Sequence, residues 1–259
     1  MTAKKRFALT ITALLVLTGF SAAAYHYGKK YSYQKDILKA AEEGKRGFWA
    51  LAAEKVDRHR FDMLSNENDC NTLLNVYANA KKGERLEWAA QACLEAGVEN
   101  FGVYLSLSIA QELLGRDQEA IQLLDQIIKK FEKEPTAYRR LAMIFSRNKD
   151  EARATEIMYL AATRTQDAQI CLDALQALLN QKRIAEALTL AQILKTTPTE
   201  NPEVKLIVAR ALIAGKEATG GSAQINEAKF LMEKLDPVKK SQLEKQYADV
   251  LKTSKSKLK

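Results

Sequence analysis

Three arginines and one methionine form the part of the sequence best suited to hold a ligand. Arg139, Met143 and Arg147 recur every four residues, which places them on one face of a helix, and Arg140 lies beside them. A guanidinium can hold a carboxylate through paired hydrogen bonds, and methionine offers an adaptable apolar contact. We therefore predict that this face contacts a partner protein or peptide.

A second stripe of the same spacing is purely amide. Asn71, Asn75 and Asn79 also recur every four residues. Asparagine is a poor helix former, so helix propensity does not explain the three residues. Their amides can donate to and accept from a peptide backbone, which makes them candidates for partner binding. For both stripes the alternative is ordinary helix surface with contacts between neighbouring helices.

The residue types needed for catalysis or metal binding are scarce. The chain has two histidines, His26 at the end of an apolar stretch and His59 in a charged run. No glycine-rich phosphate loop follows a strand pattern, and the three cysteines lack the spacing of metal ligands. We therefore expect no enzymatic activity, no cofactor and no metal site.

Two of the cysteines are placed to form a disulfide. Cys70 lies 12 residues before the turn signal at Lys82, and Cys93 lies 11 residues after it. In an antiparallel helical hairpin these similar distances bring the two thiols to the same level. A disulfide is expected if the protein is exported, and two buried free cysteines are the alternative. Cys171 is left over and is expected to be buried.

The helices that carry these residues repeat along the chain. Within residues 101–135, the second apolar helix has Ala120, Leu124 and Ile127 at the spacing i, i+4, i+7. The same stripe recurs at Leu86, Ala90 and Cys93, at Ala154, Met158 and Ala161, at Ala187, Ala191 and Leu194, and at Ala228, Met232 and Leu235. The first members are separated by 34, 34, 33 and 41 residues. A period of about 34 residues indicates stacked helical hairpins.

The first helix of each hairpin has its own pattern, and this pattern resembles the tetratricopeptide (TPR) repeat. The matching sets are Cys70, Leu73, Leu74 and Tyr77; Tyr104, Leu107, Ser108 and Gln111; Tyr138, Leu141, Ala142 and Phe145; and Cys171, Ala174, Leu175 and Leu178. The resemblance covers about residues 67–236 and is degenerate, with cysteine replacing the first aromatic twice and Gln111 replacing the later one. It implies an all-α TPR-like helical-hairpin solenoid.

The TPR resemblance also implies where a partner binds. In such arrays the first helices line a concave groove that takes extended or helical peptides, so the asparagine and arginine stripes would both face this groove. The lysine-asparagine carboxylate clamp known in the family matches poorly here, so that specificity is not carried over.

An apolar segment precedes the repeats. Residues 1–6 are basic, and residues 7–28 carry no charge and are long enough as a helix to cross a bilayer. One interpretation is a single-pass anchor in a bacterial-type inner membrane with the repeats on the periplasmic side. The other is a signal peptide cleaved near Ala22-Ala23-Ala24, which leaves a soluble periplasmic protein. An intracellular protein with a buried N-terminal helix is the least favoured alternative.

Helix-breaking residues and charged segments predict the remaining domain boundaries. Residues 29–66 are expected to form a helical spacer or a degenerate first hairpin. The fifth hairpin is expected over 203–214 and 224–235, interrupted by a flexible glycine-rich loop at Gly215–Gln224. A capping helix at 237–252 and a disordered basic tail at 253–259 complete the chain.

The charge and the repeats together suggest a function. The formal net charge is +8, but three of these charges lie at Lys4–Arg6 and four in the lysine tail, so the body is near neutral and nucleic acid is not expected as a partner. We expect a scaffold or assembly factor of the cell envelope that binds other proteins. The alternative is a self-associating structural component with no peptide ligand; the oligomeric state does not follow from the sequence.

Overall fold

The fold is described from a computed structural model, which describes residues 28–57, 67–196, 199–216, 218–235 and 237–257. All regular elements in these ranges are helices. Residues 28–45 form the first helical stretch. The helices that follow are α2 (Trp49–Val56), α3 (Glu67–Asn79), α4 (Gly83–Glu95), α5 (Phe101–Leu113), α6 (Asp117–Lys130), α7 (Pro135–Arg147), α8 (Glu151–Thr165), α9 (Ala168–Asn180), α10 (Ile184–Thr196), α11 (Pro202–Ala214), α12 (Ala218–Met232) and α13 (Pro237–Lys257).

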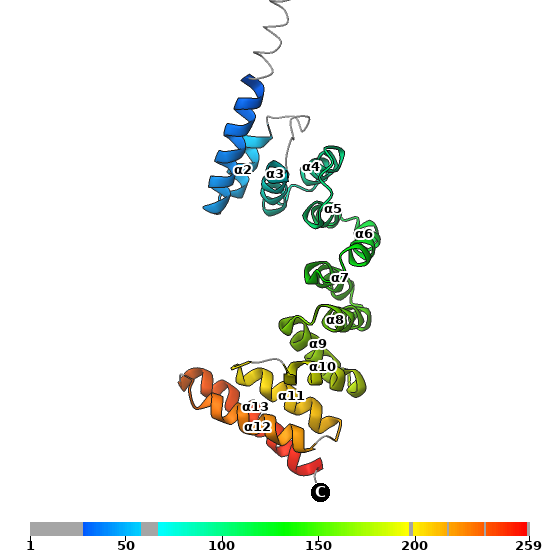
Figure 1. The fold of residues 1–259 in the computed structure, drawn as a ribbon, viewed down its shortest axis with the longest axis vertical. Helices are drawn as coiled ribbons and strands as arrows, with labels where there is room; N and C mark the ends of the chain where they lie inside the picture. The colour runs from blue at the N-terminus through cyan, green and yellow to red at the C-terminus, as the bar shows by residue number, and fades with distance from the viewer. Residues whose placement is uncertain (1–27, 58–66, 197–198, 217, 236, 258–259) are drawn as a thin grey trace, which may run out of the picture. The chain divides into compact units, whose positions relative to one another are not determined.

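The chain divides into two compact units, Met1–Leu123 and Leu124–Lys259. In the first unit α3 packs against α4 and also against α5, the first helix of the next hairpin. In the second unit α7 packs on α8, α8 on α9, α9 on α10 and α10 on α11 (Figure 1). The further contacts of α8 with α10 and of α9 with α11 show that like helices of successive hairpins meet. Each unit is therefore an all-α stack of helical hairpins.

The apolar stripes read from the sequence form the core of these stacks. All five second-helix stripes have their first residue at most 5% exposed, at Leu86, Ala120, Ala154, Ala187 and Ala228, and the same burial holds for Cys70, Tyr138 and Cys171 in the first helices. Small residues at these positions let the paired helices approach closely, while the tyrosine rings fill the space between hairpins. Four apolar stripe residues depart from the pattern because they are only half-buried: Tyr104, Leu107, Met158 and Leu235.

The turn inside each hairpin repeats with the same backbone geometry. Positive φ angles occur at Lys81, Gly115, Lys149, Lys182 and Lys216, so the steps are 34, 34, 33 and 34 residues. In the first four turns the N–H of the next residue donates to the carbonyl five residues earlier, at 2.8 to 3.0 Å, at Lys82, Arg116, Asp150 and Arg183. This is the Schellman arrangement, in which a left-handed residue ends the helix. The turns therefore recur with the same period as the hairpins.

The fifth hairpin is regular, which corrects the flexible loop expected at Gly215–Gln224. Residues 218–224 form the first two turns of α12. Gly221 lies 34 residues after Ala187, and Ile225 and Ala228 continue the stripe, both of them buried. The apparent step of 41 residues came from matching Ala187 to Ala228 instead of to Gly221.

The glycine at this position has a packing role. A Cβ atom added at Gly221 would lie 2.6 Å from Cγ1 of Ile213 and 3.4 Å from the carbonyl oxygen of Ala209, both on α11. Only glycine therefore lets α12 approach α11 this closely. A glycine-rich segment predicts flexibility only when no neighbouring helix covers it.

The part of residues 29–66 that the structure describes forms a hairpin, the second of the two expected arrangements. Residues 28–45 pair with α2, and Tyr33 and Ile37 share one buried cluster with Ala52 and Val56. Trp49 packs on Gly44, where an added Cβ would lie 2.4 Å from the indole ring.

Two expectations concern the ends of the chain. The apolar segment 7–28 and the basic residues before it lie outside the described residues, apart from Gly28. Of the helices that are described, none has both the length and the apolar composition needed to cross a bilayer. At the other end, α13 continues to Lys257, which corrects the disordered tail expected from residue 253. No glycine or proline interrupts the sequence there, and the Thr253 hydroxyl donates to the carbonyl of Asp249 at 2.9 Å.

Candidate partner-binding site

The second unit has a hollow of about 350 Å³ where α7, α8 and α9 meet. Its lining residues are mostly small or apolar: Arg139, Ala142, Met143 and Ser146 from α7, Glu151, Ala154, Thr155 and Met158 from α8, and Asp173 and Ala177 from α9. The three alanines leave the space that larger side chains would fill. Met143 is 64% exposed, which is unusual for a large apolar residue. The hollow can accept an apolar side chain from outside.

Local sequence explains why these helices present the hollow. Pro135 occupies the first turn of α7, where its missing N–H leaves no bond unmade. Ala137, Leu141 and Ile144 turn one face of α7 into the core, so Met143 lies on the other face. The α9 helix begins at an N-cap, Asp167, whose carboxylate accepts from the N–H of Ile170 at 2.9 Å.

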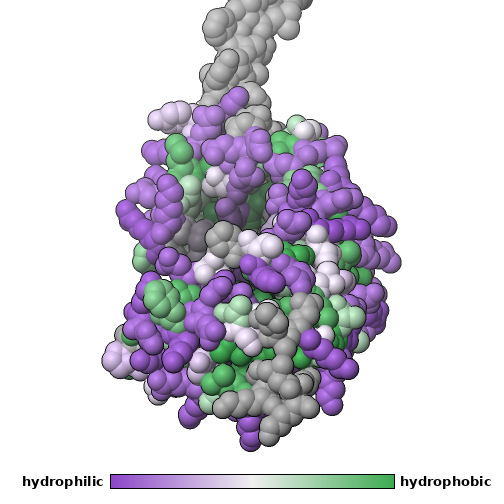
Figure 2. Space-filling view, turned by 60° about the horizontal axis from the view of Figure 1, so that its bottom comes forward, coloured by the Kyte–Doolittle hydropathy of each residue, from purple (hydrophilic) through white to green (hydrophobic). Residues whose placement is uncertain are grey.

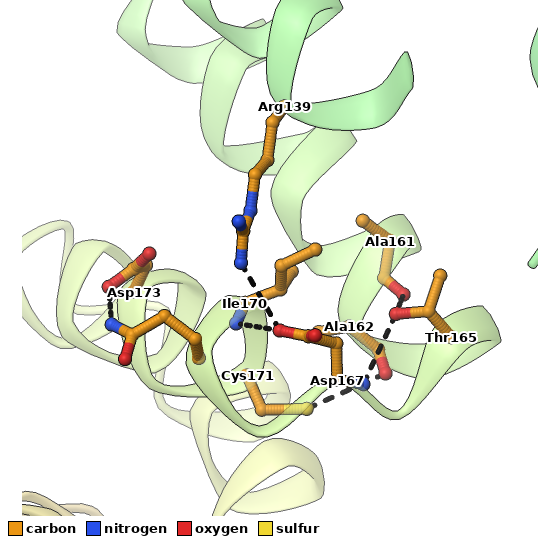
Figure 3. A network of polar contacts seen from close by, with 9 residues as sticks. Arg139, Ala161, Ala162, Thr165, Asp167, Ile170, Cys171 and Asp173 are labelled. Atoms are coloured by element: carbon orange, nitrogen blue, oxygen red, sulfur yellow. Dashed lines mark hydrogen bonds and ion pairs between the residues drawn. The ribbon is translucent and has the colours of Figure 1, made fainter. Parts of the chain in front are cut away.

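Arg139 lies at the edge of the hollow, and its charge is already paired. Figure 3 shows Arg139 reaching from α7 toward Asp167 at the start of α9, where Nη2 lies 3.2 Å from Oδ1. The Nε of Arg139 is buried without an acceptor among the described residues. A carboxylate from a partner would have to compete with Asp167 for this guanidinium. The ion pair links α7 to the start of α9. It also argues against the paired carboxylate contact that the sequence led us to expect at Arg139.

Replacing Asp167 is expected to destabilise the second unit more than replacing Arg139. Asp167→Ala removes both the N-cap and the ion pair, which lowers the free energy of unfolding by about 1–2 kcal/mol. Arg139→Gln removes only a partly exposed ion pair and is expected to lower it by at most about 1 kcal/mol. Urea unfolding followed by circular dichroism measures both. Asp173→Ala, on the same helix but not at a cap, is the control, and an equal effect of all three variants would contradict this account.

The two acidic residues of the hollow have neutral partners. Glu151 accepts from the Ser146 hydroxyl at 3.1 Å, and Asp173 accepts from the Gln169 amide at 2.8 Å. Neither carboxylate has a cationic partner within the described part of the chain. The ion pair of Arg139 with Asp167 is neutral as a whole, so the hollow as lined carries excess negative charge.

The other residues singled out in the sequence lie elsewhere. Arg140 and Arg147 are on α7 but do not line the hollow. In the first unit the stripe Asn71, Asn75 and Asn79 lies exposed on α3. The Asn79 amide donates to the carbonyl of Asn75 at 2.8 Å, a bond within its own helix. The asparagine stripe belongs to the first unit and the hollow to the second.

Most of the residues lining the hollow were not predicted. Met158 was assigned to the buried stripe, and no pattern in the sequence singled out Glu151 or Asp173. The three alanines are the feature of the sequence that could have indicated the hollow, because small residues on facing helices leave room between them. Figure 2 shows hydrophilic side chains over most of one face of the molecule, with hydrophobic patches between them.

The cysteines of the first unit are joined. Cys70 and Cys93 form a disulfide with Cα atoms 5.9 Å apart, and both residues are fully buried. The bond links α3 to α4 near the end of the hairpin away from its turn. Cys171 is free and buried in the second unit, where its thiol donates to the carbonyl of Ala162 at 3.6 Å. Burial, with a smaller effect of Asp167, raises the pKa of the Cys171 thiol to about 11, so the thiol is protonated at neutral pH.

Metal-binding groups are not found in the described ranges, where no three His, Cys, Asp or Glu side chains come together. His26 and His59 lie outside these ranges. The described residues therefore offer contact surfaces and hollows as candidate functional features, among them the hollow between α7, α8 and α9.

The chain thus belongs to the class of all-α helical-hairpin arrays. No family model matches it, and no curated protein sequence matches it. Its arrangement of helices is similar to that of PilF from Pseudomonas aeruginosa, at 14% identity and a TM-score of 0.47, over 80% of this chain and 95% of that one. BtubC from P. vanneervenii is also similar, at 14% identity and a TM-score of 0.43, over 80% of this chain and 94% of that one.

A third similar structure is the TPR2AB domain of yeast Sti1, solved in complex with pHSP90. It is 14% identical, with a TM-score of 0.37, over 86% of this chain and 98% of that one. The likeness in all three cases is one of helix arrangement, so the function proposed below rests on this chain's own residues.

Proposed function

We propose that this protein is a binding scaffold or assembly factor, and that the hollow between α7, α8 and α9 holds a segment of a partner protein. The observation that carries the proposal is the hollow itself, with small residues at its base and Met143 exposed at its edge. Peptide-binding sites of this size take one anchoring side chain, and the surrounding helices supply the polar contacts.

The proposed place of action is the cell envelope. Residues 7–28 have the length and composition of a membrane anchor or signal segment, and a basic stretch precedes them. The Cys70–Cys93 disulfide supports the same location, because disulfides persist in oxidising compartments such as the periplasm. In this proposal the repeats are on the periplasmic side of a bacterial-type inner membrane, either anchored or released by cleavage.

A photo-crosslinking experiment tests the binding site. A photo-reactive phenylalanine derivative placed at Met143 in the full-length protein is expected to capture a partner, which mass spectrometry then identifies. The same group at Phe230, which is 60% exposed in the same unit, is the control for random collisions. Equal capture from both positions, or none from Met143, would contradict the proposal.

A pair of tryptophan variants tests whether the partner occupies the hollow. Ala177→Trp puts a large side chain inside the hollow and is expected to reduce capture at Met143 at least about tenfold, since an anchoring side chain contributes upwards of 1.4 kcal/mol. Ala185→Trp places the same ring on the exposed face of α10 and should leave capture unchanged. If both variants capture the partner equally well, the partner does not occupy the hollow.

Self-association is the second candidate function. The first hairpin leaves Tyr31 71%, Leu38 68% and Phe48 57% exposed, which is the kind of surface that a second copy can cover. Light scattering across a range of concentrations distinguishes the candidates. A mass that rises with concentration and falls in Leu38→Asp, with no other protein captured at Met143, favours the structural component.

A further inference from the structure

The hollow has a charge that the sequence did not predict. Its lining includes one arginine and two acids, and the arginine is already engaged by Asp167, which does not line the hollow. Among the residues that the structure describes, the printed partners of Glu151 and Asp173 are the neutral Ser146 and Gln169. They come from different helices, α8 and α9, and both are exposed.

Opposite charges that face each other across a protein interface favour the matching partner, and like charges placed there disfavour the wrong one. A cation brought to Glu151 or Asp173 by a partner would be favoured, and an anion brought there would be repelled. The neutral donors Ser146 and Gln169 hold the two carboxylates in place without neutralising them.

The apolar residues of the hollow favour an apolar side chain of the partner. Ala142, Ala154 and Ala177, with Met143 and Met158, present methyl and thioether groups. A volume of about 350 Å³ accommodates one leucine, methionine or phenylalanine side chain with its adjoining backbone. Methionine side chains adapt to different apolar shapes, so the hollow tolerates variation among such residues.

We infer that the hollow recognises a partner segment in which an apolar side chain is flanked by lysine or arginine. The apolar side chain enters between α7 and α9, and the flanking cations reach Glu151 and Asp173. This inference rests on the proposed function and specifies its ligand. It reverses the expectation from the sequence, in which arginines were to hold a carboxylate of the partner.

A peptide selection tests the inference. A phage-displayed library of random linear peptides is selected on the full-length protein, and peptides that also bind the Ala177→Trp variant are removed. The remaining peptides are expected to share an apolar residue with lysine or arginine within a few positions of it. Synthetic peptides of the selected sequences are then titrated against the parent protein by fluorescence anisotropy.

Charge variants complete the test. Glu151→Gln combined with Asp173→Asn is expected to weaken the selected peptides roughly fivefold at low salt, and added salt should reduce the difference. The control is Asp125→Asn combined with Glu156→Gln, which removes two exposed acids outside the hollow and should leave the affinity unchanged.

The outcomes distinguish failure of this inference from failure of the proposed function. Selected peptides with acidic flanks, or an affinity that ignores the Glu151 and Asp173 changes, would overturn the inference and leave the proposed function standing. If no peptide distinguishes the parent from Ala177→Trp, the hollow is not a peptide site and both fail. Basic flanks together with the fivefold loss support both.

Discussion

Reduction of the Cys70–Cys93 disulfide is expected to lower the free energy of unfolding of the first unit by about 3 kcal/mol. The bond closes a loop of 23 residues between two helices, and breaking it gives the unfolded chain more conformations. The native hairpin keeps its apolar contacts, since both cysteines are fully buried among Leu73, Tyr77 and Ala90 in one cluster. The effect therefore arises mainly in the unfolded state.

Tryptophan fluorescence is the appropriate probe for this prediction. The chain has two tryptophans, Trp49 and Trp88, and both lie in the first unit. Guanidinium unfolding followed by this signal, with and without a reductant, measures the change directly. The Cys70→Ala/Cys93→Ala variant should behave like the reduced protein and should not respond to the reductant.

Counting thiols provides the control. Native protein isolated without a reductant should have no reactive thiol at neutral pH, because Cys171 is buried with a raised pKa. Denaturation without a reductant should expose one thiol, and denaturation with a reductant should expose three. Three thiols without a reductant would show that the bond is absent from the isolated protein.

Much of the fold could be predicted because its signals are local. The stripes that include Leu86, Ala120 and Ala187 report burial within single helices, and their period gives the hairpin. The turns were found from composition, but their left-handed residues were not. Lysine occupies this conformation at Lys81, Lys149, Lys182 and Lys216, although lysine has no preference for it. At Lys81, Lys149 and Lys182 the helix-ending hydrogen bonds of the next residue select the conformation.

The site was predicted only in part because it depends on contacts between helices. Periodicity placed Arg139 and Met143 on one face of α7; in the structure Met143 is exposed and Arg139 is half-buried. The partner of Arg139 is Asp167, 28 residues away, and no local pattern could pair these two residues. The charge of the hollow depends on this pairing together with Glu151 and Asp173, which two other helices contribute. The type of partner that we propose therefore depends on the tertiary structure.

The largest effect in the second unit is expected at Gly221. Replacing a glycine inside a helix by alanine normally stabilises the helix by about 1 kcal/mol. At Gly221 an added Cβ would meet Ile213, which is buried and has little room to move. We therefore expect Gly221→Ala to destabilise the unit by about 1 kcal/mol and Gly221→Leu by about 3 kcal/mol, in the range of overpacked cores. Thermal unfolding followed by circular dichroism measures both variants.

The control is a helical glycine in open surroundings. No atom lies within 4 Å of a Cβ built at Gly28, so Gly28→Ala should follow helix propensity and should not destabilise the protein. A double-mutant cycle then assigns the cause. Ile213→Ala removes the atom that the new Cβ would meet, so Gly221→Ala should be much less destabilising in that background than in the parent. An equal effect in both backgrounds would show that α12 does not rest on α11 at this glycine, and that the sequence-based prediction of a flexible loop was the better description.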